Sequence, residues 1–125
     1  MPPDPLAPHR GRHRLLLVFA PSRASAAFEA QERALAGHEA GMAERHLLLI
    51  DVFEEGPSRS DRAALSDADA DALRARFAPA SRAFAAVLVG KDGTAKARFD
   101  APVLPDELFA RIDAMPMRRR EMGEG

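Results

Sequence analysis

A short loop behind the first apolar run carries the residue types best suited to binding a ligand. The run Leu15–Phe19 is followed by Pro21, and Ser25 is placed to begin a helix. A helix start presents unpaired N–H groups and a partial positive charge, which favour an anion. Ser22 and Arg23 would add a hydroxyl and a guanidinium, so Ser22, Arg23 and Ser25 are the candidate residues for binding an anion or a partner. The alternative interpretation is that the serines cap the helix and Arg23 is solvated. Serine caps are common at helix starts, and this favours the alternative.

Other chemistries are excluded by residues that the chain lacks. The sequence contains no cysteine, which excludes a thiolate nucleophile, a disulfide framework and a dithiol redox cycle. The stretch Asp67–Asp71 is similar to the opening of a calcium loop, but Ala72 and Ala78 stand where that loop needs Gly and Glu. The stretch is therefore interpreted as the acidic first turn of a helix.

The methionines and histidines form no recognisable site. Thioethers bind Cu(I), but methionine is also a gap-filling core residue, and the histidines lie in separate predicted elements. A nucleophile–base–acid triad cannot be assembled from them. We therefore expect no catalytic residue, no metal site and no cofactor. The residues concerned are Met115, Met117, Met122, His9, His13, His38 and His46.

Charge and hydropathy limit the kinds of partner. The 125 residues carry a formal net charge of -1, and the basic clusters His9–Arg14 and Arg118–Arg120 contain no aromatic residue for base stacking. No apolar run approaches the roughly 20 residues that a membrane helix needs. We expect neither nucleic-acid binding nor membrane insertion. The expected partner is an unidentified protein or a small anionic ligand, and no oligomeric state is predicted.

The apolar runs predict strands that alternate with helices in a single domain. Phe28, Leu35 and Met42 recur at a spacing of seven, which is typical of the core-facing side of a helix. The pair Asp92-Gly93 predicts a hairpin, and Glu54–Arg62 is expected to be a polar connection. The expected strands are Leu15–Phe19, His46–Phe53, Phe84–Val89 and Thr94–Phe99, and the expected helices run from Ser25 to about Gly41, from Ser66 to Pro79 and from Pro105 to Met115.

This order, β-α-β-α-β-β-α, is typical of the α/β class with a thioredoxin-like core. We expect a four-stranded mixed sheet in the order 2-1-3-4, with the first crossover right-handed. The last strand, Thr94–Phe99, should be an edge strand, because Lys96 and Arg98 alternate with smaller or apolar residues.

Three segments carry a resemblance to a known family: RLLLVFAPS at 14–22, VLVGKDG at 87–93 and IDAMPMRRREM at 112–122. Together they resemble a bacterial domain-of-unknown-function family with a thioredoxin-like fold, related to domains of secreted sushi-repeat and coiled-coil-domain matrix proteins. The resemblance covers roughly residues 10–122. It implies the fold and no particular reaction or ligand.

The chain departs from redox thioredoxins at both of their catalytic parts. The dithiol of those proteins follows the first strand, where this sequence has 20–25, APSRAS, without sulfur. Their cis-proline precedes the third strand, where this sequence has Ser81, Arg82 and Ala83. A trans backbone is expected there, because a cis bond without proline costs about 2.5–4 kcal/mol. Thiol-disulfide oxidoreductase and peroxiredoxin activities are therefore excluded.

The two ends are expected to lie outside the packed domain. Residues 1–13 are rich in proline and arginine and predict a flexible arm, 14–117 form the domain, and 118–125 predict a flexible polar tail. No export signal is visible, so the sequence as given indicates the cytoplasm. The alternative is a periplasmic or secreted protein whose signal is missing from this chain.

The function expected from the sequence is that of a non-redox thioredoxin-like binding module without the catalytic dithiol. A partner would use the loop Pro21–Arg23 or add a strand to the edge Thr94–Phe99. The alternatives are a thiol-independent enzyme or anion-binding protein that uses the first helix N-terminus, and a purely architectural domain.

Overall fold

The computed structural model describes residues 4–61 and 63–123 of the chain. Residues 1–3 of the predicted arm, Arg62 of the predicted connection and residues 124–125 of the predicted tail lie outside the described residues. The elements are η1 (Ala7–His9), β1 (Arg14–Ala20), α1 (Ala26–Leu35), α2 (Glu39–Glu44), β2 (Leu47–Phe53), β3 (Ser58–Ser60), β4 (Ala63–Leu65), α3 (Asp67–Phe77), β5 (Ala85–Val89), β6 (Ala95–Phe99), α4 (Pro105–Asp113) and α5 (Pro116–Glu121).

The strands form one mixed sheet in the order β4-β3-β2-β1-β5-β6. Strands β1 and β2 are parallel and the other neighbours are antiparallel. The four predicted strands are neighbours in the predicted order, and β6 is an edge strand as expected. The predicted number of four strands is wrong, because the expected polar connection after β2 folds back as the β3–β4 hairpin. These short strands are held by backbone pairing with their neighbours. The residues Ser58–Ser60 show no alternation of apolar and polar side chains, so the sequence did not predict a strand there.

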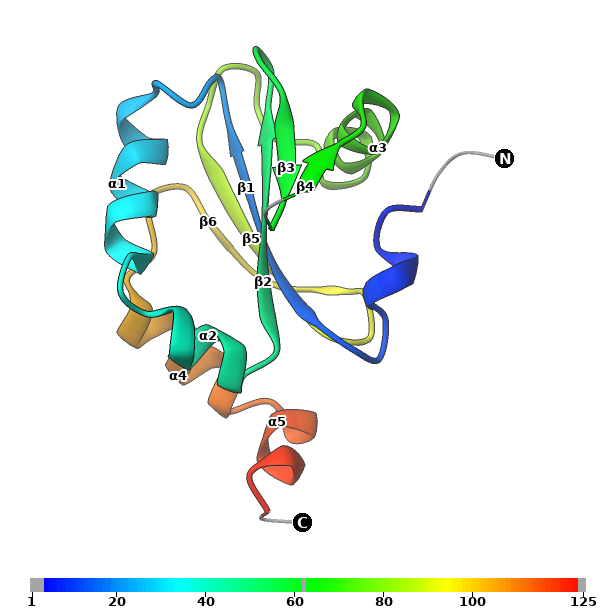
Figure 1. Ribbon diagram of the computed structural model, residues 1–125, viewed down its shortest axis with the longest axis vertical. Helices are drawn as coiled ribbons and strands as arrows, with labels where there is room; N and C mark the ends of the chain where they lie inside the picture. Colours follow the sequence, from blue (N-terminus) through cyan, green and yellow to red (C-terminus); the bar gives the residue numbers. More distant parts are fainter. Residues whose placement is uncertain (1–3, 62, 124–125) are drawn as a thin grey trace.

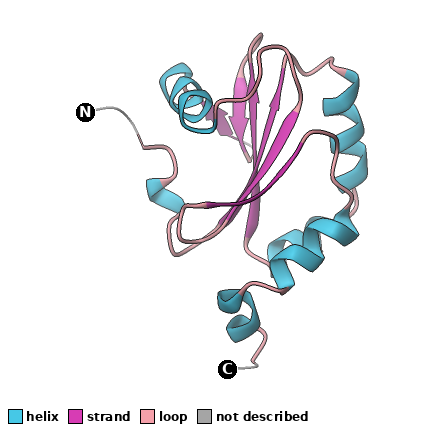
Figure 2. Cartoon of the chain, turned by 180° about the vertical axis from the view of Figure 1, so that it is seen from behind, coloured by secondary structure: helices cyan, strands magenta, loops and turns pink. Residues whose placement is uncertain are grey.

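Two apolar layers hold the helices against the sheet. Because side chains alternate along a strand, Leu16 and Val18 of β1 face α1 and α4, whereas Leu15 and Leu17 face α3. Figures 1 and 2 show α1, α2 and α4 on one side of the sheet and α3 with η1 on the other. Within the described residues, no helix is long and apolar enough to cross a membrane.

The predicted first helix is interrupted. Helix α1 ends at Leu35, and α2 begins only at Glu39. Gly37 adopts a φ of 84°, a left-handed conformation that leaves the helix and that glycine adopts without a steric penalty. The chain therefore turns between α1 and α2, and the helix expected to reach Gly41 becomes two.

At both ends of the described chain, residues beyond the expected domain boundaries at 14 and 117 pack against the domain. Leu6 is 1% exposed and joins the layer under α3. Pro116 begins α5, an element not predicted, because proline suits the first turn of a helix as well as it ends the preceding one. Leu6 and α5 thus belong to the packed domain, while the mobility expected of the two ends stays a prediction.

Helix α5 is fixed by ion pairs that we call the C-terminal clamp, formed by Arg14, Lys91, Asp113, Arg118 and Glu121. The Glu121 carboxylate accepts hydrogen bonds from Arg14 Nη1 and Nη2 at 3.1 and 3.0 Å and from Lys91 Nζ at 2.6 Å. Arg118, whose side chain is 4% exposed, donates to Asp113 Oδ1 at 3.0 Å. The segment IDAMPMRRREM therefore attaches α5 to the sheet.

Candidate functional site

The structure places the three predicted loop residues at the start of α1. Ser25 Oγ accepts a hydrogen bond from Phe28 N at 3.2 Å and caps the helix, and Ser22 Oγ accepts one from Ala24 N at 3.2 Å. Arg23 is exposed. Both hydroxyls are thus used by the neighbouring backbone, as the capping interpretation expects, and a ligand-binding role of Ser22, Arg23 and Ser25 stays a prediction.

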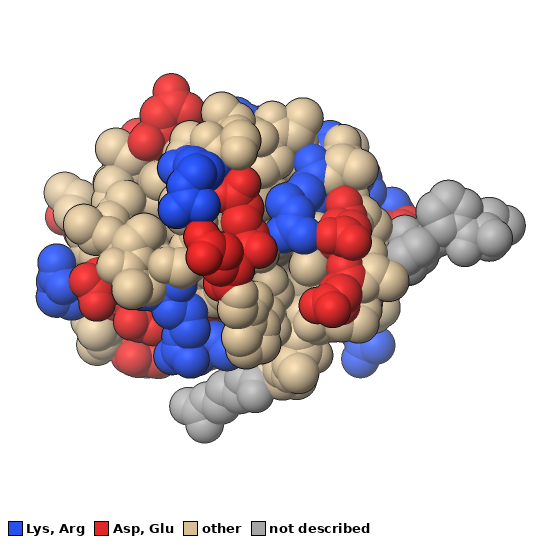
Figure 3. All heavy atoms as spheres, turned by 90° about the horizontal axis from the view of Figure 1, so that it is seen from above, with Lys and Arg blue, Asp and Glu red and all other residues tan. Residues whose placement is uncertain are grey.

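The surface around this loop carries charges of both signs. Figure 3 views the molecule from the end where β1 leads into α1, and Lys and Arg side chains there are interleaved with Asp and Glu side chains. Glu55 N, for example, donates to Pro21 O of the loop at 2.9 Å, and Glu55 Oε2 accepts a hydrogen bond from Arg82 Nη1 at 2.8 Å. This face therefore offers no concentrated positive charge for an anion.

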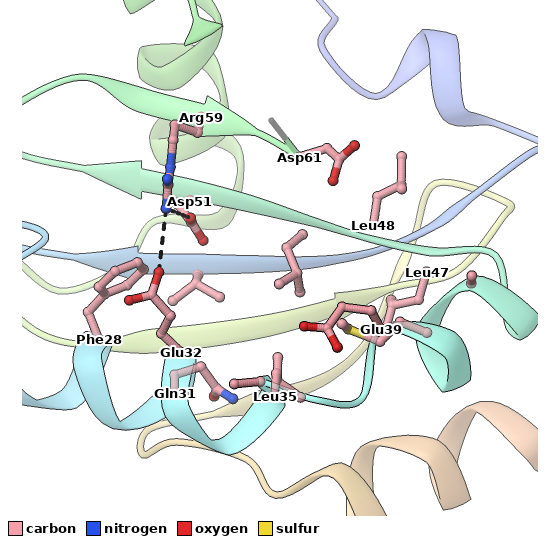
Figure 4. A pocket seen from close by; sticks show the side chains of 15 residues that line it. Phe28, Gln31, Glu32, Leu35, Glu39, Leu47, Leu48, Asp51, Arg59 and Asp61 are labelled. Carbon is pink, nitrogen blue, oxygen red and sulfur yellow. Dashed lines mark hydrogen bonds and ion pairs between the residues drawn. The ribbon is translucent and has the colours of Figure 1, made fainter. Parts of the chain in front are cut away.

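A cavity lies on one side of the sheet, between α1–α2 and β2–β3. We call it the acidic groove; its volume is about 550 Å³, within the range of roughly 300–1,000 Å³ that is usual for ligand sites. The hairpin extends the sheet beyond β2, so strand β3 forms a wall opposite the helices (Figure 4). The lining residues are Val18, Phe28, Gln31, Glu32, Leu35, Ala36, Glu39, Met42, Ala43, Leu47, Leu48, Leu49, Asp51, Arg59 and Asp61.

Apolar side chains form much of the groove. Phe28, Leu35 and Met42, the residues at the spacing of seven, lie there together with Leu47 and Leu49 of β2. The first four of these are at most 8% exposed and belong to the core layer. The same residues that attach α1 and α2 to the sheet therefore also line an apolar surface that a ligand would contact.

Helix α1 is fixed over this groove by a buried amide. Gln31 is 2% exposed; its Nε2 donates to Val103 O at 2.9 Å and its Oε1 accepts from Val103 N at 2.8 Å. One side chain thereby satisfies both backbone groups of a residue in the segment before α4, which ties that segment to α1.

Asp51 is the charged residue on the groove face of β2. Because alternate side chains share a face, Asp51 lies on the same side as Leu49 and Phe53. In the antiparallel register it stands opposite Arg59 of β3, whose Nη2 donates to Asp51 Oδ2 at 3.0 Å. Burial raises the pKa of Asp51, and the hydrogen bond from Arg59 partly opposes that rise.

A second carboxylate meets the same guanidinium. Glu32 of α1 points toward Arg59, and its Oε2 lies 3.7 Å from the same Nη2 atom (Figure 4). Glu39 and Asp61 also line the groove, so four carboxylates and one guanidinium are among its lining residues. Arg59 Nε is buried and has no hydrogen-bond partner. The groove can therefore attract a cation that carries an apolar stem.

Sequence reasoning missed these residues. The available signal was Asp51, a carboxylate inside a run that otherwise predicts a buried strand. Its partner Arg59 could not be found, because their contact depends on the unpredicted hairpin. Among residues 4–61 and 63–123, no group of three or more His, Asp or Glu side chains is arranged to hold a metal ion.

The shape of the molecule is similar to that of solved peroxidases. Plasmodium yoelii thioredoxin peroxidase I superposes with a TM-score of 0.66 at 19% sequence identity, over 92% of this chain and 79% of that chain. Plasmodium yoelii Prx1a modified at its N-terminus gives the same TM-score and identity and is covered to 80%. At this identity the likeness concerns the fold alone, and the fold is thioredoxin-like.

Relatives by sequence include sushi repeat-containing proteins of vertebrates. SRPX2 of Xenopus laevis is 27% identical over 116 residues, which are 90% of this chain and 25% of that protein. Human SRPX is 30% identical over 114 residues, which are 89% of this chain and 25% of that protein. The chain thus spans about a quarter of these relatives, and the bacterial affiliation expected from the resemblance stays a prediction.

The family resemblance expected from the sequence is confirmed by a match that extends over nearly the whole domain. It begins one residue before the buried Leu6 and ends at Glu121 of the C-terminal clamp. Residues 5–121 match the family described as Domain of unknown function (DUF4174), and the chain belongs to that family.

Proposed function

We propose that this protein is a non-redox binding domain whose acidic groove holds the ligand. The observation that carries the proposal is the cavity of about 550 Å³, in which an apolar lining meets a buried, charged Asp51. Apolar cavities with a few convergent polar groups are the usual form of binding sites. A carboxylate kept in a largely buried place is costly to stability, which is typical of residues retained for function.

The fold without its thiols supports binding rather than redox chemistry. The chain has no cysteine, so the thioredoxin-like scaffold has no sulfur nucleophile. The relatives SRPX2 and SRPX contain the matching region as about a quarter of a longer chain. A domain of this kind is suited to binding a protein partner and so attaching its own chain to it. We take a protein partner as the ligand of the groove.

The groove is a better candidate surface than the loop after β1. The hydroxyls of Ser22 and Ser25 are already bonded to backbone N–H groups, and the surrounding surface mixes both signs of charge. The groove has both volume and a net negative charge among its lining residues. Cytoplasmic and secreted locations both stay predictions, and either is compatible with this role.

The test is a titration of the ¹⁵N-labelled chain with a pool of capped hexapeptides, followed by amide chemical shifts. We expect shifts concentrated in α1, α2 and β2. Ala43 lines the groove from an exposed position on α2, and Ala40 is exposed on the same helix without lining it. Ala43→Phe should fill the groove and abolish the shifts, whereas Ala40→Phe should preserve them.

Two results would overturn the proposal. One is that the peptide pool shifts no groove amides. The other is that Ala43→Phe leaves binding intact, since the peptides would then occupy another surface.

A further inference from the structure

We infer that the acidic groove recognises an arginine side chain of a protein partner, and that Arg59 occupies the place of that arginine in the free domain. The inference rests on the proposed function and names the chemistry of its ligand. Figure 4 shows the arrangement on which it is built: the guanidinium of Arg59 lies between a carboxylate of β2 and a carboxylate of α1.

The first step concerns the geometry of the bound guanidinium. Arg59 Nη2 lies 3.0 Å from Asp51 Oδ2 and 3.7 Å from Glu32 Oε2. Two carboxylates from different elements thus converge on one planar cation. A guanidinium offers several donors in a fixed plane and matches carboxylates better than an ammonium does, so an arginine fits this place better than a lysine.

The second step is that the hydrogen-bonding groups of Arg59 are not all paired in this place. Its Nε is buried without a hydrogen-bond partner, and its side chain is 32% exposed. An unpaired buried donor destabilises the arrangement that contains it. Arg59 also lies on a strand of three residues that pairs with β2 at two positions, so moving its side chain outward disturbs little. A partner's guanidinium can therefore replace it.

The third step concerns charge. Besides Asp51 and Glu32, the groove is lined by Glu39 and Asp61, and Arg59 is the sole cation among the described lining residues. Glu39 accepts a hydrogen bond from Gly37 N at 3.2 Å. Clefts lined by one sign of charge concentrate the opposite sign, so the groove favours a basic ligand over an anionic one.

The fourth step concerns the stem of the ligand. Long basic side chains bury their methylene groups against apolar surface while the charged head meets its partners. Leu35, Met42, Leu47 and Leu49 offer such a surface next to the carboxylates. The cavity of about 550 Å³ exceeds the room that one arginine side chain needs, so neighbouring residues of the partner also enter. The ligand is thus a peptide segment with an arginine among apolar residues.

The experiment uses two capped heptapeptides of leucine and serine with either arginine or citrulline at the centre. Citrulline keeps the shape of arginine but is uncharged. Binding to the full chain is measured by amide chemical shifts at low and at high salt. We expect the arginine peptide to bind at least about fivefold more tightly, and the difference to shrink at high salt.

Three variants test the individual residues. Glu32→Gln, at a side chain that is 58% exposed, should weaken binding of the arginine peptide roughly threefold without affecting the fold. Arg59→Gln should tighten it roughly fivefold, because the internal competitor is removed. Glu29→Gln is the matched control, since Glu29 is exposed on the same helix and does not line the groove. It should leave the affinity unchanged.

The outcomes separate this inference from the proposed function. Equal binding of both peptides, blocked by Ala43→Phe, would overturn the arginine inference and leave the groove as a binding site. A loss of affinity in Arg59→Gln would show that Arg59 contacts the ligand, and would overturn its role as a stand-in. If hexapeptides from the pool bind but neither heptapeptide does, the inference fails alone; if nothing binds, both fail.

Discussion

Replacing Glu121 by glutamine should destabilise the domain strongly at neutral pH and much less in acid. The Glu121 side chain is 20% exposed and accepts three hydrogen bonds from the cations of Arg14 and Lys91. Burial acts to raise the pKa of Glu121, but the hydrogen bonds from Arg14 and Lys91 outweigh it and lower the pKa from 4.5 to about 2. The ionised carboxylate is therefore bound more tightly in the folded state than the protonated one.

The contribution of Glu121 to the free energy of unfolding follows from the difference between its unfolded and folded pKa values. A carboxyl whose pKa is depressed in the folded state contributes stability above its unfolded pKa, and loses that contribution as the pH falls through the folded pKa. The interval between 4.5 and about 2 corresponds to about 3 kcal/mol at pH 7. At pH 3 the contribution falls to about 1 kcal/mol, because most of the titration difference has been lost.

Urea unfolding of the wild-type chain and of Glu121→Gln at pH 7 and pH 3 measures this contribution. The free energies of unfolding should differ by about 3 kcal/mol at pH 7 and by about 1 kcal/mol at pH 3. Glu107→Gln is the control, because Glu107 forms an exposed pair with Arg111 that should contribute less than about 1 kcal/mol. A destabilisation by Glu121→Gln that is the same at both pH values would refute the electrostatic explanation.

Three further substitutions test the structural tasks assigned above. Arg118→Ala should cost about 2 kcal/mol and abolish amide-exchange protection in α5; full protection there would mean that other contacts hold the helix. Gln31→Ala should cost about 2 kcal/mol in urea unfolding, because it leaves both buried backbone groups of Val103 unpaired, and a cost near zero would contradict this. Ser25→Ala should lower the free energy of unfolding by about 1 kcal/mol through loss of the cap, and an unchanged midpoint would argue against the capping role.

The parts of the fold that were predictable are those whose signals are local. The run Leu15–Phe19 is apolar at every position, which is typical of a strand covered on both faces, and β1 is indeed central. Ser25 and Ser66 each precede a helix, and both cap it with their side chains. These features depend on neighbours in the sequence, so the sequence alone reveals them.

The parts that escaped prediction depend on distant contacts. Strands β3 and β4 have three residues each and no apolar alternation, and they exist because β2 offers them a partner. The sequence of α5 predicts a polar tail rather than a helix, because the contacts that stabilise α5 come from Arg14 and other residues far away in the sequence. The acidic groove depends on the hairpin as well, so Asp51 was visible in the sequence while its arrangement with Arg59 was not.

The bond between Arg14 and Glu121 has a consequence for the order of folding during synthesis. The two residues are 107 positions apart, and Arg14 belongs to β1, the first strand of the described domain. Until α5 has left the ribosome, this arginine at the start of the central strand lacks its carboxylate partner. The nascent domain should therefore remain incompletely closed until translation has passed Glu121, and a chain that stops short of it should be a preferred substrate for chaperones and proteases.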